Sequence, residues 1–165
     1  MDAGVDFAKH FQDEWQTISN SIKHQMISRG VRSSNELRNT SQLVLRGQRH
    51  GRRYKVPGTY RRQRDKTDGK MKNGRYYTAS APGEPPAVRT GAFRMSWKPR
   101  TYVDYTGDYT VKSSVESTQR TDGGQYLLGE ILENGTGRMA PRPHQDEILK
   151  KTLPKILKIY NEPYI

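Results

Sequence analysis

The first thirty residues alternate between apolar and polar positions at the spacing of an amphipathic helix. Asp2 fits an N-cap, and Gly30 carries the signal of a glycine just past a helix end. We expect the apolar stripe to face the rest of the domain or another subunit, with Trp15 in the core. The stripe recurs in steps of three and four and comprises Val5, Ala8, Phe11, Trp15, Ile18, Ile22 and Met26.

A second helix is predicted from Ser33, because Ser33-Ser34-Asn35-Glu36 has the form of a capping box. The positions expected to face inward are Leu37, Val44 and Leu45. The helical pattern fades near Gly47 or Gly51.

Residues 47–77 have few apolar side chains and most of the excess charge. Between Arg46 and Arg75 there are 12 Lys or Arg and two acids, a charge of +10, while the whole chain carries +12. The segment exceeds ordinary loop length, so we expect disorder, a long β-hairpin or a functional arm. The sequence therefore predicts one domain, residues 1–165, with a basic arm at 47–77.

Period-two alternation typical of strands begins at Phe93. Residues 93–105 are predicted to form a strand, and 109–115 its antiparallel partner across the turn Thr106-Gly107-Asp108. Residues 125–133 fit a short helix or a strand, and periodicity does not decide between them.

The last helix is predicted over about 144–161, with a kink or a break at Pro154. Helix, helix, arm, antiparallel sheet and helix in this order predict an α+β fold. The inward positions of the last helix are expected to be Ile148, Leu149, Leu153, Ile156, Leu157 and Tyr160.

Amino-acid composition excludes several classes of protein and favours others. Hydrophobic residues make up 32% of the chain, below the share of nearly half in a compact monomer, so a disordered segment or dependence on neighbours in an assembly is expected. Without cysteine, disulfides and thiolate metal sites are unavailable. No apolar run reaches membrane-spanning length and residues 1–10 lack a secretory signal, so we expect a soluble, cytosolic origin.

Catalytic signals are weak. The four histidines lack metal-ligand spacing, and Gly135-Thr136-Gly137 lacks the length and lysine of a phosphate loop. Ser96, His144 and Asp104 could form a hydrolytic set, but almost any sequence offers such residues. Glu133 fits capping or salt bridging better than acid–base catalysis. We expect no enzyme, no metal and no cofactor.

Two segments combine glycine with proline, which together restrict the backbone to defined corners. The first is residues 81–97, APGEPPAVRTGAFRMSW, and the second is residues 125–143, QYLLGEILENGTGRMAPRP. In this order they resemble motifs of the neck, or tail-completion (head–tail joining), proteins of long-tailed bacteriophages. Those proteins typically carry PxxTGxLRxSI, then strands, then YaxyvExGTxxMxaRPF and a closing helix. The similarity covers roughly residues 78–160.

Thr90 to Trp97 and Tyr126 to Pro143 are the matching stretches. Two positions depart from the family pattern: Ala92-Phe93 replaces a small residue followed by Leu, and His144 stands where an aromatic residue usually follows Arg-Pro.

The resemblance implies a structural virion protein of the neck, assembled in the bacterial host cytoplasm and contributing to the conduit for DNA ejection. Its partners would be further copies in a six- or twelve-fold ring, a head-closure or adaptor ring, the tail terminator or tail tube, and passing DNA. The two stiff segments would supply the interface residues, namely Pro85, Thr90, Gly91, Phe93, Glu133, Gly135, Thr136, Met139, Arg142 and Pro143.

The basic arm is open to two interpretations. Its cations could neutralise DNA phosphates in a salt-dependent way, or they could dock on an acidic protein, which is favoured because a DNA conduit must let DNA slide. A small basic nucleic-acid-binding protein is the alternative function. The candidate contacts are Arg46, Arg49, Arg52, Arg53, Lys55, Arg61, Arg62 and Arg64.

Overall fold

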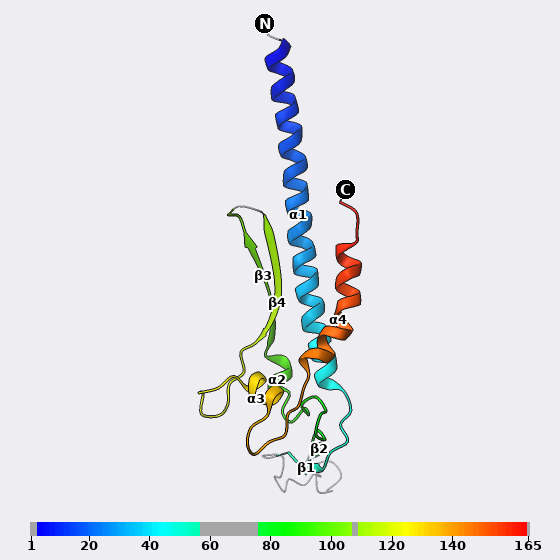
Figure 1. Cartoon of the computed structure of the whole chain (residues 1–165), viewed down its shortest axis with the longest axis vertical. Coiled ribbons are helices and arrows are strands. Elements are labelled where there is room, and N and C mark those ends of the chain that lie inside the picture. Colours follow the sequence, from blue (N-terminus) through cyan, green and yellow to red (C-terminus); the bar gives the residue numbers. More distant parts are fainter. Residues whose placement is uncertain (1–2, 57–75, 107–108, 165) are drawn as a thin grey trace, which may run out of the picture.

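A computed structural model describes residues 3–56, 76–106 and 109–164, with backbone alone for residues 3–8. The long helix α1 (Ala3–Arg46) is followed by the short paired strands β1 (Arg53–Lys55) and β2 (Tyr76–Thr78). Next come α2 (Ala92–Met95), the antiparallel hairpin of β3 (Trp97–Asp104) and β4 (Thr110–Ser117), α3 (Leu128–Asn134) and α4 (Gln145–Tyr160). Figure 1 shows α1 running between the β3–β4 hairpin and α4.

The α+β class is confirmed, as are the antiparallel hairpin and the closing helix. β3 begins at Trp97 rather than Phe93, because residues 92–95 form the single turn α2. Residues 128–134 are helical, which settles the alternative left open for that segment. Pro154 lies inside α4, and the helix continues through it to Tyr160.

The predicted end of the first helix at Gly30 is wrong, because α1 continues to Arg46. Gly30 lies where the helix contacts the hairpin. A Cβ there would lie 2.5 Å from Val111 Cγ1 and 3.0 Å from Thr101 Cγ2. In addition, Ser113 Oγ donates to Gly30 O at 2.8 Å. The glycine therefore permits close helix–sheet approach and does not end the helix.

The predicted helix start at Ser33 is wrong for a similar reason, although residues 33–46 are helical and Val44 and Leu45 are buried, as predicted. Ser33 and Ser34 are buried inside α1, not at a helix start. Ser34 Oγ donates to Val31 O (3.0 Å) and lies 3.2 Å from Thr101 Oγ1. The small hydroxyl side chain of Ser34 thus contacts the hairpin, and the backbone of Ser33 and Ser34 stays helical within α1.

The described residues contain a small and unusually polar core. Its buried hydrophobic members are Val44, Leu45, Ile148 and Ile159. The buried polar side chains outnumber them and are Arg29, Ser33, Ser34, Thr40, Ser41, Ser80, His144 and Thr152. Close packing of α1 against the hairpin and α4 therefore uses small residues more than large apolar ones.

Two apolar stripes point away from this core. The N-terminal half of α1 extends beyond the hairpin and α4 (Figure 1), so the prediction of a core Trp15 is wrong and its side chain is 65% exposed. On α4, Ile148 is buried and Ile156 half-buried, as predicted. The other four predicted inward positions are exposed: Leu149, Leu153, Leu157 and Tyr160.

Arg29 fixes the far end of α4 to the middle of α1. Its Nη1 donates to Tyr160 O (3.3 Å), and its Nη2 donates to Glu162 O (2.6 Å) and Pro163 O (2.9 Å). The guanidinium carbon also lies 3.8 Å from the ring centroid of Tyr164. A buried arginine is thus matched by backbone acceptors rather than by an acid.

Pairing of β1 with β2 agrees with the β-hairpin alternative for the ends of the basic arm. The candidate residues Arg61, Arg62 and Arg64 fall outside the described residues. Among the described helices, none combines the length and apolarity needed to cross a membrane.

Candidate interaction site

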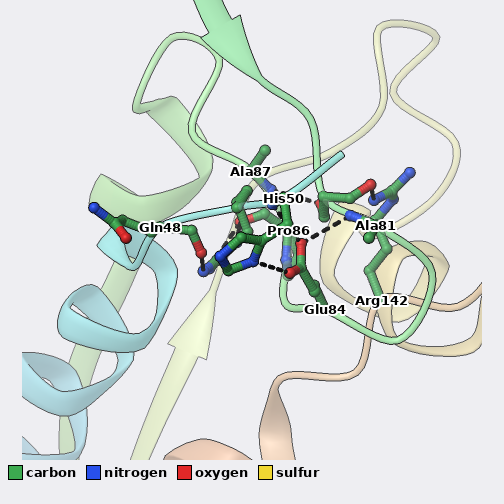
Figure 2. A network of polar contacts seen from close by, with 9 residues as sticks. Gln48, His50, Ala81, Glu84, Pro86, Ala87 and Arg142 are labelled. Carbon is green, nitrogen blue, oxygen red and sulfur yellow. Dashed lines mark hydrogen bonds and ion pairs between the residues drawn. The ribbon is translucent and has the colours of Figure 1, made fainter. Parts of the chain in front are cut away.

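The two stiff segments meet at one place, together with the end of α1. We call this place the junction; it comprises residues 47–51, 79–91 and 139–144. Gly83 N donates to Pro141 O (3.4 Å), and Arg142 Nη1 donates to Ser80 O (2.6 Å). Figure 2 shows these loops converging around Glu84 and His50. Segments about fifty residues apart in sequence therefore form a single unit.

Glu84 is the polar centre of the junction. Its Oε2 accepts from Ala81 N (2.8 Å) and His50 N (3.1 Å), and its Oε1 lies 2.6 Å from His50 Nδ1. The Ala81 amide foremost, followed by the His50 ring and amide, lowers the pKa of Glu84 to about 2. The carboxylate thereby ties the end of α1 to the proline-rich loop.

Arg49 adds a second tie between the same elements. Its Nη2 donates to Val44 O (2.8 Å) at the C-terminus of α1, and its Nε donates to Pro86 O (3.3 Å) in the loop. The guanidinium therefore satisfies carbonyls at a helix end, where a cation is also favoured by the helix dipole. Arg49 was predicted to contact DNA or an acidic partner, but in this structure it binds its own chain.

Glu133 and His144 form the corner that leads into α4. Glu133 Oε2 accepts from His144 N (2.9 Å) and Gln145 N (3.3 Å), and His144 Nδ1 lies 2.7 Å from the same oxygen. The capping interpretation of Glu133 is therefore confirmed. A carboxylate at this position satisfies free amides of the first helical turn.

His144 occupies a small aromatic cluster. Its side chain is buried, and its ring meets those of Phe93 and Trp97 edge-on at centroid distances of 5.7 Å and 5.8 Å. Phe93 and Trp97 themselves lie 5.8 Å apart. The imidazole thus packs as an aromatic ring at the corner before α4.

Gly135 makes a tight turn just before the junction. Its φ of +74° favours glycine, and a Cβ would lie 2.6 Å from Met139 O and 2.8 Å from Pro141 N. Two backbone hydrogen bonds close the turn, from Thr136 N to Met139 O (2.8 Å) and from Met139 N to Thr136 O (3.1 Å). Any side chain at Gly135 would therefore push the backbone itself apart.

A groove of about 680 Å³ lies beside the junction. Apolar side chains from three elements line it: Val88, Phe93, Leu128, Leu132 and Met139. Arginines also line it: Arg89, Arg94, Arg120 and Arg142. Arg142 is held inward by Ser80 O, and its own amide donates to Leu132 O (2.7 Å).

The predicted interface residues divide into two groups. Those that hold the junction together within the chain are Phe93, Glu133, Gly135 and Arg142. Those that are exposed are Thr90, Thr136 and Pro143, whereas Pro85, Gly91 and Met139 are half-buried. An interface role stays a prediction for both groups, but for the first group a structural role within the chain is also evident.

The described part of the basic arm packs aromatic rings against its own cations. Arg53 lies 4.5 Å over the ring of Tyr76, Arg52 lies 5.7 Å over that of Tyr54, and Tyr54 stacks on Tyr77 at 5.9 Å. Four of the predicted contact residues are exposed here: Arg46, Arg52, Arg53 and Lys55. Tyr54 and Tyr77 therefore pack on each other within the chain.

The three residues of the hydrolytic set, Ser96, His144 and Asp104, each bond to a partner outside the set. Ser96 Oγ donates to Phe93 O (2.7 Å), and Asp104 Oδ1 accepts from Thr106 N (3.0 Å) at the opposite end of β3. His144 instead faces Glu133. Within the described ranges, no cluster of three or more His, Asp or Glu residues could hold a metal ion.

Sequence reasoning missed two features: the role of Arg29 and the outward direction of the α4 stripe. Arg29 falls seven residues after Ile22, on the same helical face as the apolar stripe. A cation at such a position was the available signal for a buried guanidinium.

No protein-family model, curated protein or solved structure matches this chain.

Proposed function

We propose that the chain is a structural protein of a bacteriophage neck. Copies of it would form a ring, six- or twelve-fold, that joins the DNA-filled head to the tail and contributes to the DNA conduit. The observation that carries the proposal is the imbalance between a core with few apolar residues and two rows of exposed apolar side chains on α1 and α4. Large exposed apolar patches mark interaction sites, and a protein of an assembly buries them against its neighbours.

The junction supports the same proposal. The two segments that resemble neck-protein motifs are held together where Gly83 N donates to Pro141 O and Arg142 Nη1 donates to Ser80 O. Rigid loops of this kind place the exposed Thr90, Thr136 and Pro143 at defined positions. We assign these positions to contacts with the rings above and below, namely the head-closure or adaptor ring and the tail terminator or tail tube.

The location of the protein in a particle tests this function. Virions purified from the phage whose genome carries this chain should contain it in six or twelve copies by quantitative mass spectrometry. Gold-labelled antibodies should mark the head–tail boundary in electron micrographs. Absence from the virion, or labelling of the capsid or the distal tail, would rule out the neck function.

The alternative function, a small basic nucleic-acid-binding protein, is favoured by the +10 charge between Arg46 and Arg75. Contacts to six or more phosphates would lower affinity for duplex DNA by roughly 10³-fold or more between 50 mM and 200 mM salt. Fluorescence anisotropy with a labelled duplex measures this dependence. Tight binding at physiological salt by a chain that is absent from virions would favour the alternative. A lack of binding at 50 mM salt would exclude the nucleic-acid-binding function and would also exclude DNA contact by the arm of a neck protein.

A further inference from the structure

The N-terminal half of α1 carries an apolar stripe that the described chain does not cover. Phe11, Trp15, Ile18 and Ile22 share one helical face and are between 38% and 65% exposed. The stripe lies beyond the end of α4 (Figure 1), because the residues after α4 turn onto Arg29. The described residues therefore leave these four side chains open to another molecule.

α4 carries a second stripe of similar dimensions. Its members are Leu149, Leu153, Leu157 and Tyr160, which are between 42% and 55% exposed. They lie on a different side of the helix from Ile148, Thr152 and Ile159, which are buried. Each stripe covers twelve residues, and its first and last Cα atoms are about 16 Å apart along the helix axis. The two stripes thus match in length and in number of large side chains.

The charges of the two regions are opposite. Residues 1–22 contain four acids and one lysine, a charge of −3, while the other 143 residues carry +15. α4 contains four lysines and two acids, a charge of +2. Pairing α1 with α1, or α4 with α4, would bring like charges together, whereas α1 against α4 brings opposite charges together.

We propose that the α1 stripe of one copy packs on the α4 stripe of the next copy. This inference rests on the proposed ring, since it names the contact between neighbouring subunits. Because the two patches differ, the contact is heterologous and leaves one α1 stripe and one α4 stripe free at the ends of any open chain. A ring closes when the last copy meets the first.

Two variants that each damage one stripe test the contact. Ile18→Glu places a charge in the α1 stripe and Leu153→Glu places one in the α4 stripe. Light scattering after size exclusion should show oligomers for the native chain and the 19.0 kDa monomer for each variant. An equimolar mixture of the two should give a dimer that grows no further, because one intact pair of stripes remains. Asn20→Glu, exposed on the opposite face of α1, should assemble like the native chain.

Other outcomes would overturn the contact. Dimers of Leu153→Glu alone would mean that α1 pairs with itself, and dimers of Ile18→Glu alone would mean that α4 does. Three results would exclude the α1–α4 contact: oligomers of both variants, no dimer in the mixture, or a native chain that stays monomeric. The neck function would then still be tested by the presence of the protein in virions. Open filaments that both substitutions abolish would retain the contact and reject the closed ring.

Discussion

The two halves of α1 reverse the usual distribution of residues between inside and outside. The N-terminal half exposes Phe11, Trp15, Ile18 and Ile22. The C-terminal half buries Val44 and Leu45 near its end, but most of its buried residues are small or polar: Arg29, Gly30, Ser33, Ser34, Thr40 and Ser41. In the C-terminal half, small side chains let the helix approach the hairpin and α4 closely. In the N-terminal half, no described part of the chain is near enough to cover the large ones. The described chain therefore leaves the apolar stripe open for the contact with another copy that we propose, whereas the polar half makes contacts within the chain.

The two halves of α1 also differ in what their side chains contribute to the free energy of folding. Each large apolar side chain gains about 1.5–3 kcal/mol when it goes from exposed to fully buried. Because the four side chains of the stripe are between 38% and 65% exposed, completing their burial would add roughly 3–6 kcal/mol that an isolated chain does not obtain. In the other half, the buried hydroxyls of Ser34 and Ser41 donate to helix carbonyls, Ser41 Oγ to Leu37 O at 2.8 Å, whereas those of Ser33 and Thr40 have no partner among the described residues. Satisfied polar groups contribute less per residue but specify one arrangement.

The largest effect is expected for Arg29→Met. The substitution keeps much of the aliphatic stem but removes the donors to the carbonyls of Tyr160, Glu162 and Pro163. Since unsatisfied part-buried acceptors cost about 1–3 kcal/mol each and some will regain water, we expect a loss of about 3 kcal/mol in the free energy of unfolding. Urea denaturation followed by circular dichroism measures it.

Arg32→Met is the matched control for Arg29→Met. Arg32 lies on the same helix and bonds the exposed carboxylate of Glu162 at 2.6 Å. Solvent screens exposed ion pairs strongly, so this variant should lose much less stability than Arg29→Met. Equal losses for the two variants would contradict the role given to the buried guanidinium.

A smaller loss is expected for Gly30→Ala. Alanine favours a helix over glycine by up to about 1 kcal/mol, but its Cβ would lie 2.5 Å from Val111 Cγ1. Overpacking of this kind costs about 1–3 kcal/mol, so we expect a net destabilisation of about 1 kcal/mol. In α3, a Cβ at Gly129 would make an ordinary 3.7 Å contact with Phe93, so Gly129→Ala should stabilise. Stabilisation by both substitutions would show that α1 does not need a glycine at the hairpin.

A pH-dependent effect is expected where α1 ends at the junction. The folded chain lowers the pKa of Glu84 from 4.5 to about 2, chiefly through the Ala81 amide. A lowered carboxylate pKa gives stability that is present above pH 4.5 and is lost as the pH falls towards 2. Glu84→Gln should therefore be less stable than the native chain at pH 7 and lose less stability between pH 4.5 and 2. Urea midpoints that fall in parallel for both proteins would disprove this.

The smallest effect on monomer stability is expected for Trp15→Gln. A tryptophan in a core would cost about 3–5 kcal/mol, whereas a surface substitution changes stability by about 0.5 kcal/mol or less. The comparison should be made on the Ile18→Glu background, where the chain is expected to be monomeric. A large loss of stability there would mean that Trp15 is covered by its own chain.

Much of the fold was predictable because it depends on local patterns. The turn at residues 106–108 and its flanking alternation predicted the β3–β4 pair, and the three- and four-residue spacing predicted α4. The continuous α1 was not predictable from local signals. Gly30 and Ser33 look like an end and a start, and only the hairpin packed against them explains why the helix continues.

The site was predicted in outline from the two glycine- and proline-rich segments. Their rigidity indicated corners, and the capping role of Glu133 followed from its place before the last helix. Their mutual contact was not predictable, because it depends on Arg142 reaching Ser80 across 62 residues of sequence. Likewise, helical periodicity placed the α4 stripe on one face but could not tell which face meets α1.

Arg29 also has a consequence for the order of folding. Its acceptors lie 131–134 residues away, whereas the β3–β4 hairpin pairs residues that are at most twenty positions apart, Trp97 with Ser117. Since distant contacts form slowly, we expect the hairpin to form first and the attachment of α4 to α1 to form last. Pulsed hydrogen exchange should then protect amides of β4 before those of α4, and the reverse order would refute this. A chain still folding would lack a correctly placed α4, so assembly would begin only once each subunit is complete.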